Sequence, residues 1–170
     1  MSSSTVIRPL EPNDSLEELT KLLHRAYAPL GKLGLNYTAV DQSEATTARR
    51  IAKGQCFVAV ESSNLVGTIV VDPTLPQSPC EYFARAGVAS AHQFAVAPEW
   101  QGQGLGSRLL RRAEVWAKER GFVEIAVDTA EPAEHLISYY VRWGYRRVGW
   151  VQWEGKQYRS VVMSKDLHGV

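Results

Sequence analysis

The sequence has few cysteines, almost no net charge and no long apolar run, and each of these shortages excludes a class of protein. Its 19 lysines and arginines nearly balance its 18 aspartates and glutamates, so the formal charge is only +1. No overall positive field therefore exists to collect nucleic acid or an anionic membrane. Two unclustered cysteines, Cys56 and Cys80, suit reduced thiols better than a disulfide framework or a zinc site. We expect no metal, and any anion-binding site must be local.

The start of the chain also lacks a basic segment followed by an apolar run, which argues against a secretory signal. No stretch approaches the length of a membrane span, so we expect a cytoplasmic protein. With 170 residues, of which 45% are hydrophobic, the chain can bury one substantial core. We therefore expect a single domain over residues 1–170.

Hydrophobic periodicity predicts strands and helices of the α+β class (α/β mixed). Strands are predicted over residues 5–8, 56–61, 65–71, 88–96, 123–128, 145–152 and 158–164. Helices are predicted from a cap at Asn13 or Asp14 to near Tyr27, from a cap at Ser43 to about Lys53, and over 105–120 and 133–143. The proline-containing stretch 72–87 is expected to be an irregular loop of the kind that often carries binding residues.

The most informative motif is Gln101-Gly102-Gln103-Gly104-Leu105-Gly106, which lies between a predicted strand and a predicted amphipathic helix. Three alternating glycines remove the side chains that would keep a ligand away from the backbone. The first turn of a helix leaves N–H groups without internal partners, and the helix dipole adds partial positive charge there. Such a terminus suits a phosphate or pyrophosphate. A plain turn into the helix is the alternative, but it does not need three helix-weakening glycines.

Two other phosphate-binding loops do not fit this motif. The nucleoside-triphosphate loop requires a lysine and then serine or threonine after its last glycine, whereas Ser107 and Arg108 follow Gly106 here. The dinucleotide fingerprint places its third glycine three residues after the second, whereas Gly106 follows Gly104 by two.

The segment His92-Gln-Phe-Ala-Val-Ala-Pro-Glu-Trp-Gln-Gly-Gln-Gly-Leu-Gly-Ser-Arg-Leu-Leu110 resembles the signature segment of the GNAT N-acetyltransferase superfamily. The family pattern is Gln or Arg, two residues, Gly, one residue, and Gly or Ala, and Gln101, Gly104 and Gly106 meet it. The resemblance implies the GNAT fold, a mixed central sheet of about six to seven strands flanked by about four helices. It also implies acetyl-CoA as cosubstrate.

The same resemblance implies which residues contact the cosubstrate. The glycine loop would cradle the coenzyme A pyrophosphate, and strand backbone groups would contact the pantetheine arm. In this family the strand after the helix, here 123–128, diverges from the signature strand, and the thioester enters that gap. The implied cofactor-binding residues are Phe94, Ala95, Val96, Gln101, Gly102, Gln103, Gly104, Leu105, Gly106 and Ser107.

Acetyl transfer to an amine needs a proton donor for the departing thiolate. Tyr140 precedes Gly144 by four residues and is followed by Tyr145, which resembles the family pattern of Tyr, three residues, Gly and an aromatic residue. The resemblance implies that the Tyr140 hydroxyl protonates the coenzyme sulfur. The alternative is a core tyrosine packed with Leu136 and Trp143.

The reaction also needs a base that takes a proton from the amine, and His92 is the candidate. An unperturbed histidine has a pKa near 6.5 and is mostly neutral at pH 7. Strand alternation would place Ser90, His92 and Phe94 on one face, and several small-amine acetyltransferases of the family have His or Glu at this position. The alternative is a histidine bonded to neighbouring strands, with Glu124 and Asp128 as reserve bases.

We expect an N-acetyltransferase that moves an acetyl group to a primary amine, of a small molecule, by direct attack in a ternary complex. A near-zero net charge offers little for docking a large partner. A protein N-terminal or lysine acetyltransferase and a non-catalytic acyl-CoA-binding sensor module remain alternatives. We expect no nucleic-acid or membrane partner, and a monomer or homodimer. The residues expected to line the acceptor site are Tyr27, Tyr37, Glu44, Tyr82, Phe83, Trp150 and Trp153.

Overall fold

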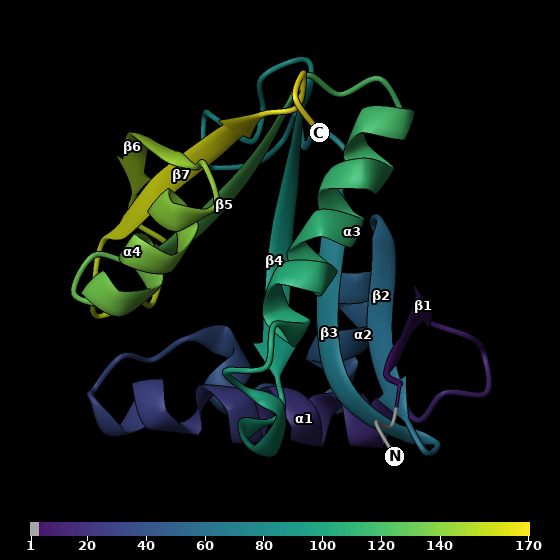
Figure 1. Ribbon diagram of the computed structural model, residues 1–170. Coiled ribbons are helices and arrows are strands. Elements are labelled where there is room, and N and C mark those ends of the chain that lie inside the picture. The colour runs from purple at the N-terminus through teal and green to yellow at the C-terminus, as the bar shows by residue number, and fades with distance from the viewer. Residues whose placement is uncertain (1–3) are drawn as a thin grey trace. The chain divides into compact units, whose positions relative to one another are not determined.

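The computed structural model describes residues 4–170, whose seven strands form a mixed sheet in the order β1-β2-β3-β4-β5-β7-β6 (Figure 1). The strands are β1 (Val6–Pro9), β2 (Gln55–Glu61), β3 (Asn64–Asp72), β4 (Val88–Val96), β5 (Glu124–Ala130), β6 (Arg146–Val151) and β7 (Ser160–Asp166). The helices are α1 (Leu16–Lys32), α2 (Glu44–Ile51), α3 (Leu105–Glu119) and α4 (Glu134–Arg142), with short 3₁₀ turns η1 (Thr38–Val40) and η2 (Pro98–Trp100). The predicted mixed sheet with about four helices is confirmed.

The described residues form two compact units. Unit 1 contains residues 4–71 and 93–113, and unit 2 contains residues 72–92 and 114–170. The boundary crosses β4 after His92 and α3 after Ala113. None of the helices in the described part of the chain is both long enough and apolar enough to cross a membrane.

In unit 1, β1, β2 and β3 form an antiparallel ladder. β2 and β3 form a hairpin, in which Asn64 is already paired with Glu61 and belongs to the strand. The connection is therefore the two-residue turn Ser62-Ser63, with φ of 46° and 71°. Two left-handed central residues match the twist of the flanking strands, as in a type I′ turn.

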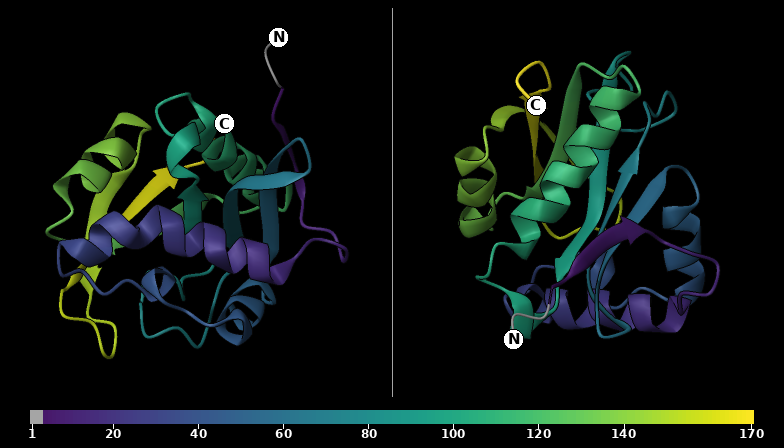
Figure 2. Two further views of the ribbon diagram at one scale, coloured as in Figure 1. Left: turned by 90° about the horizontal axis from the view of Figure 1, so that it is seen from below. Right: turned by 45° about the vertical axis from the view of Figure 1, so that its right-hand side comes forward.

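Helix α1 begins and ends later than predicted. Ser15 caps it by accepting a hydrogen bond from the Glu18 N–H, whereas the carboxylate of Asp14 is occupied by the Arg8 guanidinium at 2.7 Å and 2.9 Å. The helix continues through Pro29 to Lys32, although a proline in the helix interior removes one internal hydrogen bond. The apolar face continues with it, since Leu30 is buried two turns after Leu23. Figure 2 shows α1 together with the shorter α2, which packs on it.

Strand β4 is irregular at Gln93, which has a φ of 48° and is 3% exposed. A non-glycine residue in this left-handed region costs about 1–3 kcal/mol and persists only when its surroundings impose it. This residue lies within the stretch for which simple alternation of Ser90, His92 and Phe94 was predicted. Sequence reasoning missed this feature because glutamine gives no signal for a left-handed backbone.

In unit 2, β4 and β5 form a parallel pair, but only at the start of the two strands. Val88, Ala89 and Ser90 pair with Glu124, Ile125 and Ala126, and no later pair follows between residues 91–92 of β4 and β5. β5 pairs antiparallel with β7 along its whole length, and β7 pairs with β6. Figure 1 shows α4 lying along these strands. The loop between β3 and β4 contributes Cys80, Tyr82 and Phe83 to the core of this unit.

The packing of β3 in unit 1 yields a test of the fold. A Cβ at Gly67 would lie 2.8 Å from Leu109 Cδ1 of α3, so we expect Gly67→Ala to lower the free energy of unfolding by about 1–3 kcal/mol. Gly149→Ala is the matched control, because a Cβ there meets nothing within 4 Å. Urea denaturation of both variants measures the difference. Equal stability of the two variants would contradict this close approach of β3 and α3.

Candidate functional site

The glycine loop leaves the amides at the start of α3 accessible. The first internal hydrogen bond of the helix runs from Arg108 N–H to Gly104 O at 3.2 Å, so the first-turn amides of residues 105–107 precede the helical ladder. Gly102 and Gly104 have φ of 74° and 81°. A Cβ at Gly102 would meet no heavy atom within 4 Å, and one at Gly104 would meet only Ser107 Oγ at 4.0 Å. Backbone conformation therefore demands glycine here, and the space beside the amides suits a diphosphate.

The side chains of this motif brace the loop. Gln101 Nε2 donates to the Val96 carbonyl at 3.0 Å, and Gln103 Nε2 donates to the Glu99 carbonyl at 3.1 Å. Glu99 itself accepts from Arg25 of α1 at 2.5 Å. The two glutamines therefore hold the loop on the preceding backbone. Their predicted contact with the cosubstrate stays a prediction.

The backbone of β4 before the loop is also held by side chains. The Tyr27 hydroxyl of α1 donates to the Phe94 carbonyl at 2.9 Å, and Gln101 donates to the Val96 carbonyl, two residues further. Ala95 is buried against Leu23. Tyr27, which was expected at the acceptor site, thus contacts the strand predicted to bind pantetheine.

In unit 2, His92 is hydrogen-bonded to a residue of a neighbouring strand, which is the alternative that the sequence left open. Its Nε2 lies 2.8 Å from Asp72 Oδ2, and Asp72 is 3% exposed at the end of β3. The other carboxylate oxygen, Oδ1, is buried and has no hydrogen-bond partner among residues 4–170. A carboxylate that accepts from Nε2–H fixes one tautomer of the ring and leaves Nδ1 as a proton acceptor. A carboxylate at the end of an apolar strand, just before Pro73, was the available sequence signal.

Tyr140 lies on α4 and is 8% exposed. Its ring contacts those of Tyr139 and Tyr145, with centroids 5.7 Å and 5.5 Å away, whereas Trp143 contacts Tyr139 instead. The predicted end of this helix at Gly144 is confirmed, since the Tyr145 N–H bonds back to the Tyr140 carbonyl at 3.0 Å.

A buried polar cluster supports the neighbouring ring of Tyr145. The Tyr145 hydroxyl donates to Glu114 at 3.1 Å, and Lys165 forms an ion pair with the same carboxylate at 3.0 Å. Burial, together with the negative charge of Glu114, raises the pKa of Tyr145 well above its usual value. Tyr145 therefore remains neutral at physiological pH, and its hydroxyl donates a hydrogen bond to Glu114.

The two reserve bases are already engaged. Glu124 accepts from the Tyr82 hydroxyl at 3.0 Å and from Arg146 at 2.9 Å. Asp128 accepts from the Trp153 indole N–H at 2.8 Å. Because its lone pairs already serve two strong donors, the Glu124 carboxylate is a poorer base than a histidine with an open ring nitrogen.

The cysteines are poor nucleophiles. Burial raises the pKa of Cys56 to about 11, and it also raises the pKa of Cys80. Both thiols are free and buried. Since only the thiolate attacks, little reactive species exists at neutral pH.

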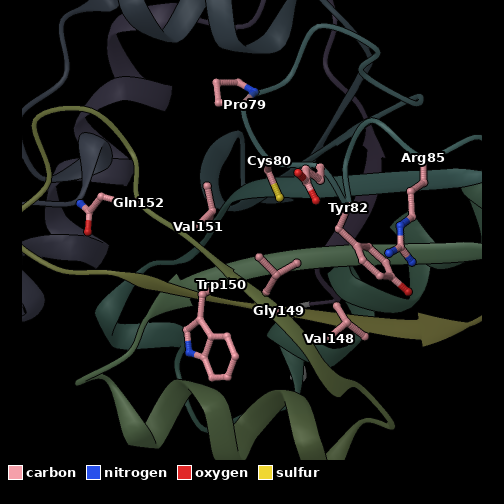
Figure 3. A pocket seen from close by; sticks show the side chains of 11 residues that line it. Pro79, Cys80, Tyr82, Arg85, Val148, Gly149, Trp150, Val151 and Gln152 are labelled. Atoms are coloured by element: carbon pink, nitrogen blue, oxygen red, sulfur yellow. The ribbon is translucent and has the colours of Figure 1, made fainter.

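A cavity of about 420 Å³ lies within unit 2 (Figure 3). It is lined by residues 79–82 and Arg85 of the loop before β4, by 148–152 of β6 and its end, and by Val162 of β7. Tyr82 and Trp150, both predicted to line the acceptor site, are among these residues, and the Arg85 guanidinium stacks 4.4 Å from the Tyr82 ring centroid. Of the other residues expected to line the acceptor site, Phe83 and Trp153 lie in the core of unit 2. Tyr27, Tyr37 and Glu44 lie in unit 1.

Comparison with known proteins identifies the family. The model of the acetyltransferase (GNAT) family matches residues 16–145. The chain belongs to the GNAT acetyltransferase family. The S-(2-succino)cysteine N-acetyltransferase of Bacillus subtilis (strain 168) is 31% identical to it over 157 residues, which cover 89% of this chain and 90% of that protein. The predicted enzyme class, an N-acetyltransferase, is confirmed.

Solved GNAT structures have the same fold. The ribosomal-protein-S18-alanine N-acetyltransferase of Escherichia coli matches with a TM-score of 0.73 and 17% identity over 96% of this chain and 94% of that chain. A GNAT acetyltransferase of Elizabethkingia anophelis, crystallised with acetyl-CoA bound, matches with a TM-score of 0.68 and 16% identity over 98% and 99%. Bound acetyl-CoA in that relative agrees with the cosubstrate predicted for this GNAT chain.

Proposed function

We propose that this GNAT protein transfers the acetyl group of acetyl-CoA directly to a primary amine of a small molecule, as one catalytic domain in the cytoplasm. The observation that carries the proposal is the loop at Gly102 and Gly104, whose left-handed glycines leave first-turn amides of α3 and the space beside them open. Acetyl-CoA supplies a thioester that an amine can attack. The protein has to bind its diphosphate, orient its pantetheine arm and manage two protons.

Each part of that work has a candidate in the chain. Residues 102–107 bind the diphosphate through backbone N–H groups, and the backbone of residues 94–96 binds the pantetheine arm. His92 takes the proton of the acceptor ammonium or amine, directly or through water, while Asp72 holds its tautomer. Tyr140 gives a proton to the leaving thiolate. No covalent enzyme intermediate is needed, in keeping with the protonated, buried thiols of Cys56 and Cys80.

For the acceptor, we propose an amino-acid derivative that carries at least one carboxylate. The Bacillus subtilis relative acts on S-(2-succino)cysteine, according to its name, and is 31% identical over most of both chains. The cavity in unit 2 has the size of small-ligand sites, which span about 300–1,000 Å³. Arg85 in its lining has no carboxylate partner among the described residues and suits an acceptor carboxylate. Protein acetylation gains no comparable support from this geometry.

The first test concerns the glycine loop. Gly104→Ala is expected to weaken coenzyme A binding about tenfold or more, because alanine disfavours a φ of 81° and its Cβ enters the space beside the amides. Gly34→Ala is the matched control, since Gly34 also has a φ of 81° and open surroundings. Both variants should lose similar stability, and calorimetry should show weaker binding only for Gly104→Ala. Unchanged affinity in Gly104→Ala would exclude the loop as the diphosphate site.

The second test concerns the base. Asp72→Asn is expected to lower kcat about 10²-fold or more, because an amide N–H facing Nε2 favours the wrong tautomer of His92. The KM for acetyl-CoA should change little. In a His92→Gln background, Asp72→Asn should have no further effect on kcat. A second, additive loss there would mean that Asp72 does not act through His92.

The third test separates an enzyme from a sensor. Tyr140→Phe is expected to lower amine-dependent thiol release about 10²-fold while coenzyme A affinity stays within about twofold, because only the proton donor is lost. Tyr139→Phe, the adjacent tyrosine on α4, should retain full activity. Full thiol release by Tyr140→Phe would remove its assigned role. If wild-type protein bound acetyl-CoA but no amine in a broad screen released thiol, the sensor function would replace the enzyme.

A further inference from the structure

The left-handed residue of β4 is held by a buried polar network in unit 1. Gln93 Oε1 accepts a 2.7 Å hydrogen bond from Gln42 Nε2, and the two residues are 3% and 5% exposed. Gln42 lies just after η1 and Gln93 lies within β4, so the contact joins segments 51 positions apart in the sequence. A buried amide pair of this kind requires partners for all its polar atoms.

Both N–H groups and the oxygen of the Gln42 side-chain amide are hydrogen-bonded. Its second N–H donates to Thr47 Oγ1 at 2.7 Å, and its Oε1 accepts from Arg50 Nη1 at 2.9 Å. The reversed amide would place an oxygen against two acceptors and an NH₂ against a cation, so the orientation is determined by the network. The Gln42 carbonyl also lies 2.7 Å from His24 Nε2 of α1, which fixes the backbone of Gln42.

The network is anchored on two helices. Thr47 of α2 is fully buried, and its Oγ1 lies 2.8 Å from Thr20 Oγ1 of α1, which is also placed to donate to the Leu16 carbonyl. Arg50, at the other end of α2, adds a long contact of 3.5 Å to Gln93 Oε1. The Gln42 amide is therefore already fixed in position when it donates to Gln93. Among the described residues, the Gln93 side chain is the only part of β4 to which Gln42 donates a hydrogen bond.

The position of Gln93 gives this network a function. Gln93 immediately precedes residues 94–96, whose backbone groups bind the pantetheine arm under the proposed function, and its φ sets the direction in which the next peptide planes point. Glutamine lacks the local hydrogen bonding that lets asparagine and aspartate adopt a left-handed backbone, so its surroundings must impose it. A regular strand with an apolar side chain here would need no buried amides.

We propose that Gln42 is a positioning residue for acetyl-CoA, which holds Gln93 in its left-handed conformation and thereby aims the backbone of Phe94, Ala95 and Val96 at the pantetheine arm. This inference rests on the proposed function, but it adds a residue that touches neither the cosubstrate nor the acceptor. If the inference is correct, Gln42 should no longer matter for coenzyme A binding when residue 93 can adopt the left-handed conformation without a hydrogen bond from Gln42.

A glycine at position 93 can adopt this left-handed conformation without the hydrogen bond from Gln42. Gln42→Met keeps the length of the side chain but loses its hydrogen bonds, and we expect it to weaken coenzyme A binding about tenfold, with a matching rise in the KM for acetyl-CoA. Gln93→Gly should bind within about threefold of wild type, since glycine populates positive φ readily. The double variant Gln42→Met/Gln93→Gly should recover to the same range. Calorimetry with coenzyme A measures all four proteins.

Two further variants guard against a merely structural effect. Ser43→Ala removes the N-cap of α2, where Ser43 Oγ accepts from Thr46 N–H at 3.1 Å, and should lower the Tm without changing coenzyme A affinity. Gln93→Ala should lose affinity as Gln42→Met does, because it keeps the backbone penalty and removes the acceptor. The contrast between alanine and glycine at position 93 therefore tests the inference even if Gln42→Met does not fold.

The outcomes are distinguishable. Wild-type affinity in Gln42→Met or Gln93→Ala would overturn the positioning role and leave the proposed function intact, as would a double variant as weak as Gln42→Met alone. Absence of coenzyme A binding by the wild-type protein would overturn the proposed function and this inference together.

Discussion

The amides at the beginning of α3 are the feature on which the proposed function of this chain depends. Capping side chains commonly cover the first N–H groups of a helix, whereas here the chain enters α3 through the left-handed backbone of Gly102 and Gly104. The Gly104 carbonyl still accepts the first helical bond from Arg108, so the helix is intact while its dipole faces an open space. The side chains of Gln101 and Gln103 hold the loop in this shape from outside.

In unit 2, the residues predicted to act as base and acid, His92 and Tyr140, lie in different surroundings. His92 has one ring nitrogen tied to a buried carboxylate, so its remaining nitrogen has a defined role. A buried carboxylate oxygen without a partner among the described residues, such as Asp72 Oδ1, lowers stability. Tyr140 instead lies among aromatic rings, in contact with Tyr139 and Tyr145.

Much of the fold could be predicted because its signals are local. Periodicity identified all seven strands and four helices, and the glycine spacing with its flanking strand and helix located the loop. The prediction placed the start of α1 before the observed cap at Ser15 and missed its extension through Pro29. Both errors have a non-local cause. Arg8 occupies the expected capping carboxylate, and burial of Leu30 outweighs the helix-breaking tendency of proline.

The predicted site residues were individual side chains, and their partners were not predictable. Asp72 lies 20 positions from His92, and Gln42 lies 51 positions from Gln93, so only the folded chain brings each pair together. No composition rule assigns a positive φ to a glutamine, which is why the irregularity of β4 and the network that supports it escaped sequence reasoning. The roles of His92, Tyr140 and the loop residues in catalysis stay predictions.

The hydrogen bond from Gln101 to the Val96 carbonyl has a consequence for how a long ligand is recognised. It joins the glycine loop to the last residue of β4, so the two stretches of backbone keep a constant spacing. A molecule that reaches both is attached at two points, and binding at one end raises the effective concentration of the other end at its own contact. Fragments that present only a diphosphate or only an amide-bearing arm lose this mutual reinforcement. Under the proposed function, the two stretches would therefore select ligands by the length between their two recognised groups.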